Sequence, residues 1–484
     1  MKYLLLSTTL LCLVLNSRAQ NDHSHQHDHT SITVKGTEYD NDLLPASFHK
    51  QRREALRALM PDSSVAVFFA NPIRNYSNDV DFEFHQDPNF YYLTGLNETN
   101  AVLYIFKEMN AIGEIITNEL IFVEPRNEAN EVWTGKVMGL EGTKEKLGFE
   151  YVFSNKDFAQ FKLEYKSFKK VLGFSIPDDI HDDKLNKGDL HSMLSVFSTD
   201  METIGKSFNK VKLVQLMAEL RQTKTNEEVL LMRKAIDITC LGIDQLMKSL
   251  KPDMTEYQSE AVVEFIFKSN GAESVGYPSI LGGGENSCIL HYNSNRKELK
   301  GKELLVCDVG AEYHGYTADV TRTLPVDGKF STEEKTIYDL VLKAQNNAIA
   351  ECKPGNKFFD PHDKAVSTIS KGLMDLGIIK KLDEVYLYFI HGTSHYLGLD
   401  VHDAGLNGSL QAGMVITVEP GIYIPEGSDC DPKWWNIGVR IEDDILITKT
   451  GYENLSDCVP RETFEIERIM AGAGLLDAAI PEKK

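Results

Sequence analysis

Five side chains in the second half of the chain have the types and the order of a metal-ligand set. They are Asp308, Asp319, His395, Glu419 and Glu442. Four carboxylates and one imidazole form a hard, oxygen-rich set, which suits manganese, or iron, cobalt or zinc in its place, better than a thiolate zinc site would. Two divalent ions held together could share a hydroxide as nucleophile and polarise a carbonyl group. The sequence therefore indicates a two-metal hydrolase.

Asp308 and Asp319 lie on two strands that the sequence predicts to pair. Residues 303–309 and 317–324 read as the two strands of a hairpin. A turn centred between residues 313 and 314 would set the two aspartates directly opposite each other, roughly 4.5–5.5 Å apart at Cβ. Two ionised carboxylates at that separation repel each other unless a cation lies between them. The spacing therefore predicts a metal ion at this hairpin.

The two glutamates are associated with two further predicted strands. Residues 414–419 form a β-branched run that ends at Glu419, and residues 437–447 form another that carries Arg440 and Glu442. Because side chains alternate along a strand, Arg440 and Glu442 would share one face. A buried arginine beside a ligating glutamate would hold the geometry of the glutamate and offset its charge.

Two nearby motifs suggest other chemistry, which the residues exclude. His391 and His395 have the i, i+4 spacing of the zinc-protease motif His-Glu-x-x-His, but Gly392 replaces the required glutamate. The glycine run at 282–284 is followed by Glu-Asn, not by the Lys-Ser/Thr pair of a phosphate-binding loop. We expect this run to form a tight turn that leads to His291.

The remaining periodicity predicts an α/β (α+β) chain of two domains. Apolar runs at 65–70, 101–106 and 120–123 are expected to be buried strands of the first domain, after a helix at 48–60. Polar residues at 205–225 predict a linker. Helices are expected in the second domain at 226–250, 255–270, 332–351 and 361–376.

Taken together, the motifs resemble the metallopeptidases of the methionine aminopeptidase/creatinase ("pita-bread") superfamily, and aminopeptidase P in particular. The segments that carry the resemblance are 84–95, 282–292, 308–323, 391–403, 418–423 and 438–444. The resemblance implies a creatinase-like N-terminal domain at 45–208 and a pita-bread catalytic domain at 209–474, followed by a C-terminal tail at 475–484.

The resemblance also implies roles for individual residues. Asp308, Asp319, His395, Glu419 and Glu442 would hold two divalent metal ions, manganese by analogy, and Glu419 would act as general base for the water that bridges them. Catalytic support would come from His291, His391 and His402, which position the substrate and steady the tetrahedral intermediate, and from Arg440 behind the ligands. Substrate-binding positions would be Tyr423 near the pocket, with Asp79 and Trp133, which match positions that a neighbouring subunit contributes in some members.

The implied activity is hydrolysis of the N-terminal Xaa-Pro bond of peptides with proline at the second position, by a homo-oligomer, dimer or tetramer. Prolidase, which cuts only Xaa-Pro dipeptides, uses the same five ligands and stays the alternative. Ser394 before the ligand histidine favours aminopeptidase P, since prolidases often carry glycine there. A metal-free pita-bread binding module would lack the ligands, and creatine hydrolysis on this fold needs no metal pair.

The N-terminus predicts export. Residues 1–19 have a lysine, an apolar run too short to be a good membrane span, and small residues before a cleavage site after Ala19. The mature protein would therefore be periplasmic or secreted. Residues 20–44 are expected to be a flexible tail whose histidine-rich tract at 23–29 could bind metal loosely.

Charge and cysteine content narrow the possibilities further. The 484 residues carry a formal net charge of −21, and without a basic run we expect no nucleic-acid partner. No segment after residue 19 is apolar enough to predict a membrane span. Of the six cysteines beyond the signal peptide, Cys430 and Cys458 lie in the C-terminal segment and are a candidate disulfide pair for an exported chain.

Overall fold

The computed structural model describes residues 41–174 and 180–475. The predicted signal peptide, the histidine-rich tract and residues 476–484 lie outside them. Within the described ranges, no helix combines the length and apolar character needed to cross a bilayer.

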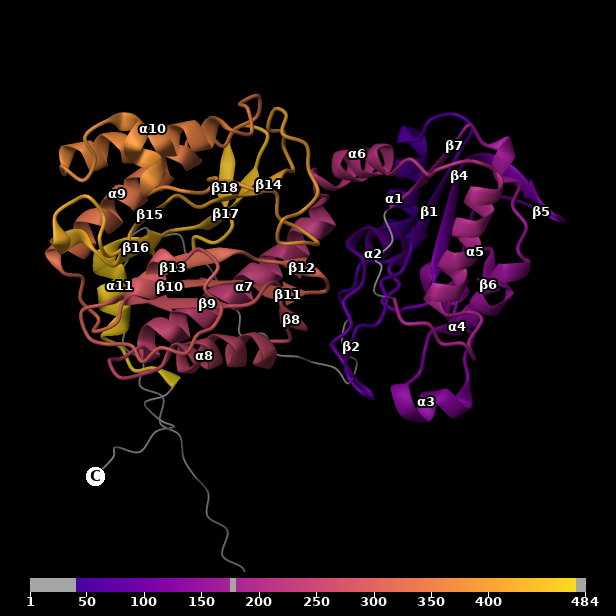
Figure 1. The fold of residues 1–484 in the computed structure, drawn as a ribbon, viewed down its shortest axis with the longest axis horizontal. Coiled ribbons are helices and arrows are strands. Elements are labelled where there is room, and N and C mark those ends of the chain that lie inside the picture. The colour runs from indigo at the N-terminus through magenta and orange to yellow at the C-terminus, as the bar shows by residue number, and fades with distance from the viewer. Residues whose placement is uncertain (1–40, 175–179, 476–484) are drawn as a thin grey trace, which may run out of the picture. The chain divides into compact units, whose positions relative to one another are not determined.

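A mixed five-stranded sheet is the centre of the N-terminal part (Figure 1). Its strand order is β6-β5-β4-β1-β7. Strand β4 runs antiparallel to both β1 and β5. The outer strand β6 is parallel to its neighbour β5, and the outer strand β7 is parallel to its neighbour β1. The strands are β1 (Ser64–Phe69), β4 (Val102–Ile112), β5 (Ile115–Val123), β6 (Val152–Ser154) and β7 (Lys170–Gly173).

Both faces of this sheet are buried, which explains why its strands are continuous apolar runs. Val65 and Val67 of β1 face a core that includes Phe197 of α5 (Leu190–Thr203), whereas Ala66 and Phe68 face the core that includes Leu56 of α1 (Ala46–Leu59). The other elements of this part are β2 (Asn75–Ser77), β3 (Val80–Asp81), α2 (Pro88–Thr94), α3 (Glu128–Thr134), α4 (Gly139–Leu147), η1 (Asn155–Gln160) and η2 (Tyr165–Ser167).

The predicted linker at 205–225 is wrong in part, because it contains a helix. Helix α6 (Lys210–Arg221) buries Leu213, Leu216 and Met217. These side chains have the i, i+3, i+4 spacing of one helix face. The lysines of the segment made it read as polar in the sequence, so its apolar period was missed.

The C-terminal part, from residue 226 onward, is built from short strands in several small sheets. Their orders are β13-β10-β9, β12-β11-β8, β14-β17-β18 and β15-β16. The strands are β8 (Ser274–Val275), β9 (Ile280–Gly283), β10 (Leu304–Val309), β11 (Ala311–Tyr313), β12 (Tyr316–Thr317), β13 (Val320–Pro325), β14 (Val415–Val418), β15 (Gly421–Ile424), β16 (Ile437–Arg440), β17 (Asp443–Ile447) and β18 (Tyr452–Asn454).

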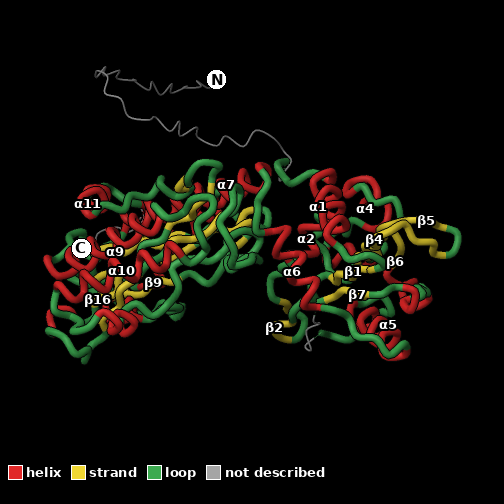
Figure 2. The backbone as a smooth tube through the Cα atoms, turned by 90° about the horizontal axis from the view of Figure 1, so that it is seen from above, coloured by secondary structure: helices red, strands yellow, loops and turns green. Residues whose placement is uncertain are grey.

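Two pairs of packed helices enclose these strands (Figures 1 and 2). Helices α7 and α8 pack together against β8, β9 and β11–β13, and α9 packs on α10 and against β14–β16. The helices are α7 (Asn226–Ser249), α8 (Glu256–Ser269), α9 (Thr332–Ile349), α10 (Asp360–Asp375) and α11 (Thr463–Met470), with short turns η3 (Gly284–Cys288), η4 (Leu382–Leu387) and η5 (Pro432–Trp434). The four predicted helices of this part are confirmed to within two residues at each end.

The register of the aspartate hairpin differs from the prediction. His314 and Gly315 both have positive φ, at 51° and 81°, and form the two-residue turn. The turn is therefore centred one residue later than expected, and Asp308 pairs with Thr321 rather than with Asp319. Asp319 lies between β12 and β13, diagonal to Asp308.

The predicted strand at 437–447 is two strands in two sheets. β16 pairs with β15, and β17 pairs with β14 and β18. The chain changes sheets at Ile441–Glu442, so Arg440 and Glu442 do not share one strand face. The guanidinium of Arg440 instead pairs with Asp308, Nη2 to Oδ2 at 2.6 Å.

The disulfide also differs from the expected pair. Cys240 of α7 is bonded to Cys458, and Cys430 is a free thiol. The two bonded cysteines are 218 residues apart, and only the packing of the C-terminal segment on α7 brings them together.

Candidate active site

One cavity of the C-terminal part gathers all five predicted ligands. Its volume is about 240 Å³, and its lining contains Asp308, Asp319, His395, Glu419 and Glu442 together with Tyr277, His291 and His402. A second hollow of about 400 Å³ is lined by His391 and Arg440 and shares five lining residues with the first, so the two form one site.

Most of the carboxylates lie where the chain passes from one small sheet to another. Asp319 separates β12 from β13, Glu419 separates β14 from β15, and Glu442 separates β16 from β17, whereas Asp308 lies within β10. At such breaks the backbone leaves one ladder before joining the next. This arrangement directs carboxylates from several strands into a common space.

The aspartates converge on a residue that the sequence did not single out. The hydroxyl oxygen of Tyr277 lies 2.6 Å from Oδ1 of Asp308 and 2.5 Å from Oδ1 of Asp319. A phenol has one proton to donate, so it satisfies only one of these short contacts. The only local signal for Tyr277 was its place in a Gly-Tyr-Pro segment, which reads as an ordinary loop.

His395 presents one ring nitrogen to two carboxylates. Its Nδ1 lies 3.0 Å from the carbonyl oxygen of Tyr396, which can only accept, so Nδ1 carries the proton of the neutral ring. Nε2 then faces Asp319 Oδ2 at 3.3 Å and Glu419 Oε1 at 3.5 Å. Although burial lowers the pKa of His395, the hydrogen bond to Asp319 and the charge of Glu419 raise it to about 9.

Three carboxyl groups of the site, those of Asp319, Glu419 and Glu442, have pKa values above the ordinary range. Burial, reinforced by the charge of Asp319, raises the pKa of Glu419 to about 7. Burial and the charges of Asp319 and Glu419 raise the pKa of Glu442 well above its ordinary value. Burial likewise raises the pKa of Asp319. Protein cations alone do not balance this acidic cluster.

These observations fit a site for divalent metal ions. Ligand atoms of Asp319, His395 and Glu442 all lie within 4.8 Å of one another. The approach of His395 Nε2 to two carboxylates, and a phenol shared by two aspartates, are arrangements that a cation between the groups would stabilise. The donor set is one imidazole with carboxylates, which suits manganese and related ions.

A hydrogen-bonded chain fixes the orientation of His391. Arg440 Nη1 donates to the hydroxyl oxygen of Tyr423 at 2.9 Å, and this hydroxyl lies 2.8 Å from His391 Nε2. His391 Nδ1 donates to the carbonyl of Gly392 and lies 3.5 Å from Glu419 Oε2. Burial, together with the charge of Arg440, lowers the pKa of His391 to about 3, so the ring is neutral near pH 7.

His402 is supported from behind by a buried ion cluster. Its neighbour Asp403 accepts a hydrogen bond from Arg221 and another from Lys224 Nζ at 2.8 Å. Burial opposes ionisation of Asp403, but the two cations outweigh it and lower its pKa. The ring of His402 lies 4.5 Å from that of His395, edge to face.

The three predicted substrate-binding residues lie outside both hollows. Tyr423 is 2% exposed and contacts His391 and Arg440 from behind. Asp79 is exposed in the β2–β3 turn, and Trp133 on α3 is 88% exposed. Neither Asp79 nor Trp133 lines a hollow with the five ligands.

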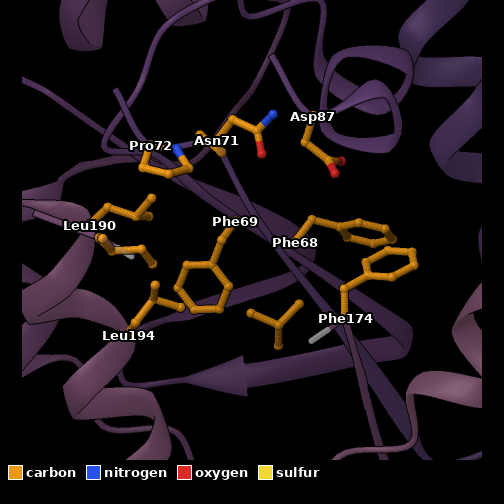
Figure 3. A pocket seen from close by; sticks show the side chains of 11 residues that line it. Phe68, Phe69, Asn71, Pro72, Asp87, Phe174, Leu190 and Leu194 are labelled. Carbon is orange, nitrogen blue, oxygen red and sulfur yellow. The ribbon is translucent and has the colours of Figure 1, made fainter. Parts of the chain in front are cut away.

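A smaller cavity in the N-terminal part has a different character (Figure 3). It measures about 120 Å³ and is lined mainly by apolar side chains such as Phe68, Phe69 and Leu194. Asp87 is its one carboxylate, and Oδ1 of this residue accepts the amide of Phe90 to cap α2. Apart from Asp87, the residues that line it carry no titratable side chain.

Known proteins match both parts of the chain. The family model "Aminopeptidase P, N-terminal domain" matches residues 49–171, and "Metallopeptidase family M24" matches residues 230–449. The Xaa-Pro aminopeptidase of Haemophilus influenzae is 36% identical over 439 residues, covering 88% of this chain and 98% of that protein. Human Xaa-Pro aminopeptidase 3 is 33% identical, covering 87% of this chain and 83% of that protein.

Solved structures agree with these relatives. Aminopeptidase P from Escherichia coli with the inhibitor Pro-Leu is 32% identical and superposes with a TM-score of 0.78, covering 89% of this chain and 99% of that one. Aminopeptidase PepP from Pseudomonas aeruginosa gives the same TM-score and identity. The chain therefore belongs to the aminopeptidase P family of M24 metallopeptidases, with a creatinase-like N-terminal domain and a pita-bread catalytic domain.

Proposed function

We propose that this protein hydrolyses the N-terminal Xaa-Pro bond of peptides with the help of two divalent metal ions. The observation that carries the proposal is the convergence of four carboxylates and His395 in one cavity, rimmed by His291, His391 and His402. Proteins similar to this chain over almost their whole length are Xaa-Pro aminopeptidases. The metal-free binding module and the creatine hydrolase are disfavoured, since neither uses such a ligand cluster.

The residues that would hold the metal ions are Asp308, Asp319, His395, Glu419 and Glu442. When bound, two divalent ions would supply an activated water and polarise the carbonyl of the scissile bond. We propose manganese, because the donors are mostly carboxylate oxygens.

Glu419 is the residue that moves protons in this proposal. Its Oε1 faces His395 and its Oε2 faces His391 Nδ1, each at 3.5 Å, so both oxygens are directed into the site. From there the carboxylate takes a proton from the attacking water and passes it to the departing proline nitrogen. A carboxyl group whose pKa is near neutrality is suited to both transfers.

The histidines bind and orient the peptide. His391 is neutral, and the hydrogen bonds of its two ring nitrogens to Tyr423 and Gly392 fix the ring beside Glu419. His291 and His402 line the same hollow. They are placed to hold the peptide carbonyl and the charge that develops on its oxygen.

The substitution Glu419→Gln tests the catalytic proposal. We expect it to lower kcat on an Xaa-Pro-Yaa peptide by at least about 10³-fold, because an amide cannot accept the proton, while the fold is retained. Glu426→Gln, at an exposed position on the loop after β15, is the control and should retain full activity. Near-normal turnover by Glu419→Gln would refute the role of Glu419.

Metal content and substrate length are tested with the same preparation. Elemental analysis of active protein should give about two manganese ions per chain, and chelation should abolish activity. Product analysis with Xaa-Pro, Xaa-Pro-Yaa and an Xaa-Ala control separates the candidates. Cleavage of the dipeptide but not of the longer peptide would favour prolidase.

We further propose that the protein is exported to the periplasm or secreted. The pattern of residues 1–19 supports this, and so does the Cys240–Cys458 disulfide, since such bonds persist in oxidising compartments. Sequencing of the N-terminus of the mature protein should begin at Gln20. An N-terminus at Met1 on protein purified from the native source would refute export by cleavage.

We also propose a homo-oligomer. Helix α3 has no buried side chain and exposes Val132 and Trp133, at 82% and 88%. Exposed apolar side chains grouped in this way are typical of protein interfaces.

A further inference from the structure

A buried carboxylate outside the ligand cluster organises the loop that carries His291. Glu256 is the first residue of α8 and is fully buried, at 0% exposure. Oε1 accepts hydrogen bonds from the amide of Gly283 and from Asn286 Nδ2, both at 2.9 Å. Oε2 accepts from the hydroxyl of Tyr292 and the amide of Lys297, both at 2.8 Å.

These four donors span the start, the middle and the end of one loop, residues 283–297. The amide of Glu256 also donates to the carbonyl of Lys297 at 2.9 Å, so two hydrogen bonds join α8 to the end of the loop. Burying a carboxylate is costly unless its oxygens are well bonded, and here each oxygen accepts two bonds. The loop therefore has one preferred conformation around Glu256.

His291 depends on this loop for its position. It lines both hollows of the active site and directly precedes Tyr292, whose hydroxyl is bound to Glu256. No hydrogen bond within the described residues restrains the imidazole of His291 itself, in contrast to His391, which is fixed through Tyr423. The position of His291 therefore depends on the backbone of the loop that Glu256 binds.

The glycine run gains an explanation from the same contact. A Cβ on Gly283 would lie 2.2 Å from Cδ2 of Leu299, so a larger residue here would force this buried leucine side chain to move. In a phosphate-binding loop the backbone amides donate to the ligand. Here the amide of Gly283 donates to the carboxylate of Glu256. The glycine run thus brings a backbone amide within hydrogen-bond distance of Glu256.

We propose that Glu256 is a positioning residue, which holds His291 against the substrate by fixing the 283–297 loop. This inference rests on the proposed function, in which His291 contacts the peptide. Glu256 itself does not line the site and takes no part in bond making.

A double-mutant cycle tests the proposal. In Glu256→Gln, the NH2 group that replaces one oxygen cannot accept, so one pair of donors, Gly283 with Asn286 or Tyr292 with Lys297, loses its acceptor. We expect kcat/KM on an Xaa-Pro-Yaa peptide to fall roughly tenfold or more. In a His291→Ala background the same substitution should cost less than about twofold, because the residue it positions is absent. Equal losses in both backgrounds would overturn the proposal.

Tyr292→Phe provides the milder variant, should Glu256→Gln fail to fold. It removes one donor to Glu256, and we expect a fall of about three- to tenfold in kcat/KM that again disappears in the His291→Ala background. Tyr257→Phe is the matched control, since Tyr257 is on the same helix and is 43% exposed. It should leave kcat/KM unchanged.

Hydrogen exchange gives a readout that does not depend on activity. Tyr292→Phe should accelerate amide exchange within residues 284–297 and leave α9 and α10 unchanged. Unchanged exchange in the loop would overturn the proposal even if the catalytic proposal holds. Conversely, a wild-type protein that cleaves no Xaa-Pro peptide would refute the proposed function, while the exchange result would still decide whether Glu256 anchors the loop.

Discussion

At the scale of single residues, histidines of one chain differ in chemistry because their surroundings differ. His395 has carboxylates opposite Nε2 and holds a proton tightly, whereas His391 is buried beside Arg440 and stays neutral. The residue type alone therefore predicts neither the charge nor the role. What each ring nitrogen faces decides both.

His49 shows the same effect away from the active site and leads to a prediction. It is 2% exposed, donates from Nδ1 to the carbonyl of Tyr92, and burial lowers its pKa to about 4. The unfolded chain, with a histidine pKa near 6.5, takes up a proton first as pH falls, so stability is lost below about pH 6.5. Between pH 7 and 5 this residue should reduce the free energy of unfolding by about 2 kcal/mol.

Urea denaturation of wild type and His49→Gln across that pH range measures the effect. The glutamine keeps a donor for Tyr92 but does not titrate, so the wild type should lose about 2 kcal/mol more than the variant. His181→Gln, at an exposed position, is the control and should follow the wild type. Parallel curves for wild type and His49→Gln would contradict the burial argument.

At the scale of elements, the ends of short strands are what build the site. The sheet changes at Asp319, Glu419 and Glu442 direct carboxylates from three strand pairs into one cavity. Behind them, Arg322 is fully buried and donates to Asp443 and to the carbonyls of Val459 and Pro460. The strands that carry the candidate ligands are thus joined to the segment that contains Cys458.

The disulfide links this segment covalently to α7, and removing the disulfide should lower the stability of the protein measurably. Cys240 on α7 bonds to Cys458, two residues before the carbonyl of Pro460 that Arg322 uses. We expect the double variant Cys240→Ala/Cys458→Ala to lower the free energy of unfolding by about 2–4 kcal/mol, because the unfolded chain regains the freedom of a long loop.

Chemical denaturation with and without reductant checks this expectation. Cys288→Ser, which alters a half-buried free thiol, is the control and should keep its sensitivity to reductant. The double variant should not respond to reductant at all. If reductant destabilised the double variant and the wild type equally, the loss of stability would not come from the Cys240–Cys458 disulfide.

At the scale of the whole molecule, the chain is acidic overall and exposes many large apolar side chains among its described residues. The net charge of −21 opposes nonspecific association, so a contact between copies needs specific apolar contacts. Val132 and Trp133 on α3 supply such contacts. We therefore expect Trp133→Ser to shift the protein toward the monomer by at least about tenfold in dissociation constant, as expected for a buried interface tryptophan.

Analytical ultracentrifugation over a range of concentrations measures this shift. Leu185→Ser is the control, since Leu185 is 97% exposed but stands apart from α3 in sequence. It should leave the association unchanged. A wild-type protein that is monomeric at all concentrations would refute the homo-oligomer.

The sequence by itself determined the types and the order of the candidate ligands and the helices that frame them. Carboxylates with one histidine are donors that suit divalent metal ions, and long amphipathic periods predict helices such as α7 and α9. The resemblance to aminopeptidase P rested on the same residues, and the matches to both domains confirmed it.

Only the tertiary structure decided how these parts meet. The hairpin register followed from positive φ at His314 and Gly315, which moved the partner of Asp308 to Thr321. The Cys240–Cys458 bond and the role of Tyr277 depend on segments that are distant in sequence. Local patterns report the period of an element and the chemistry of its side chains, but turn geometry and long-range packing determine which side chains face one another.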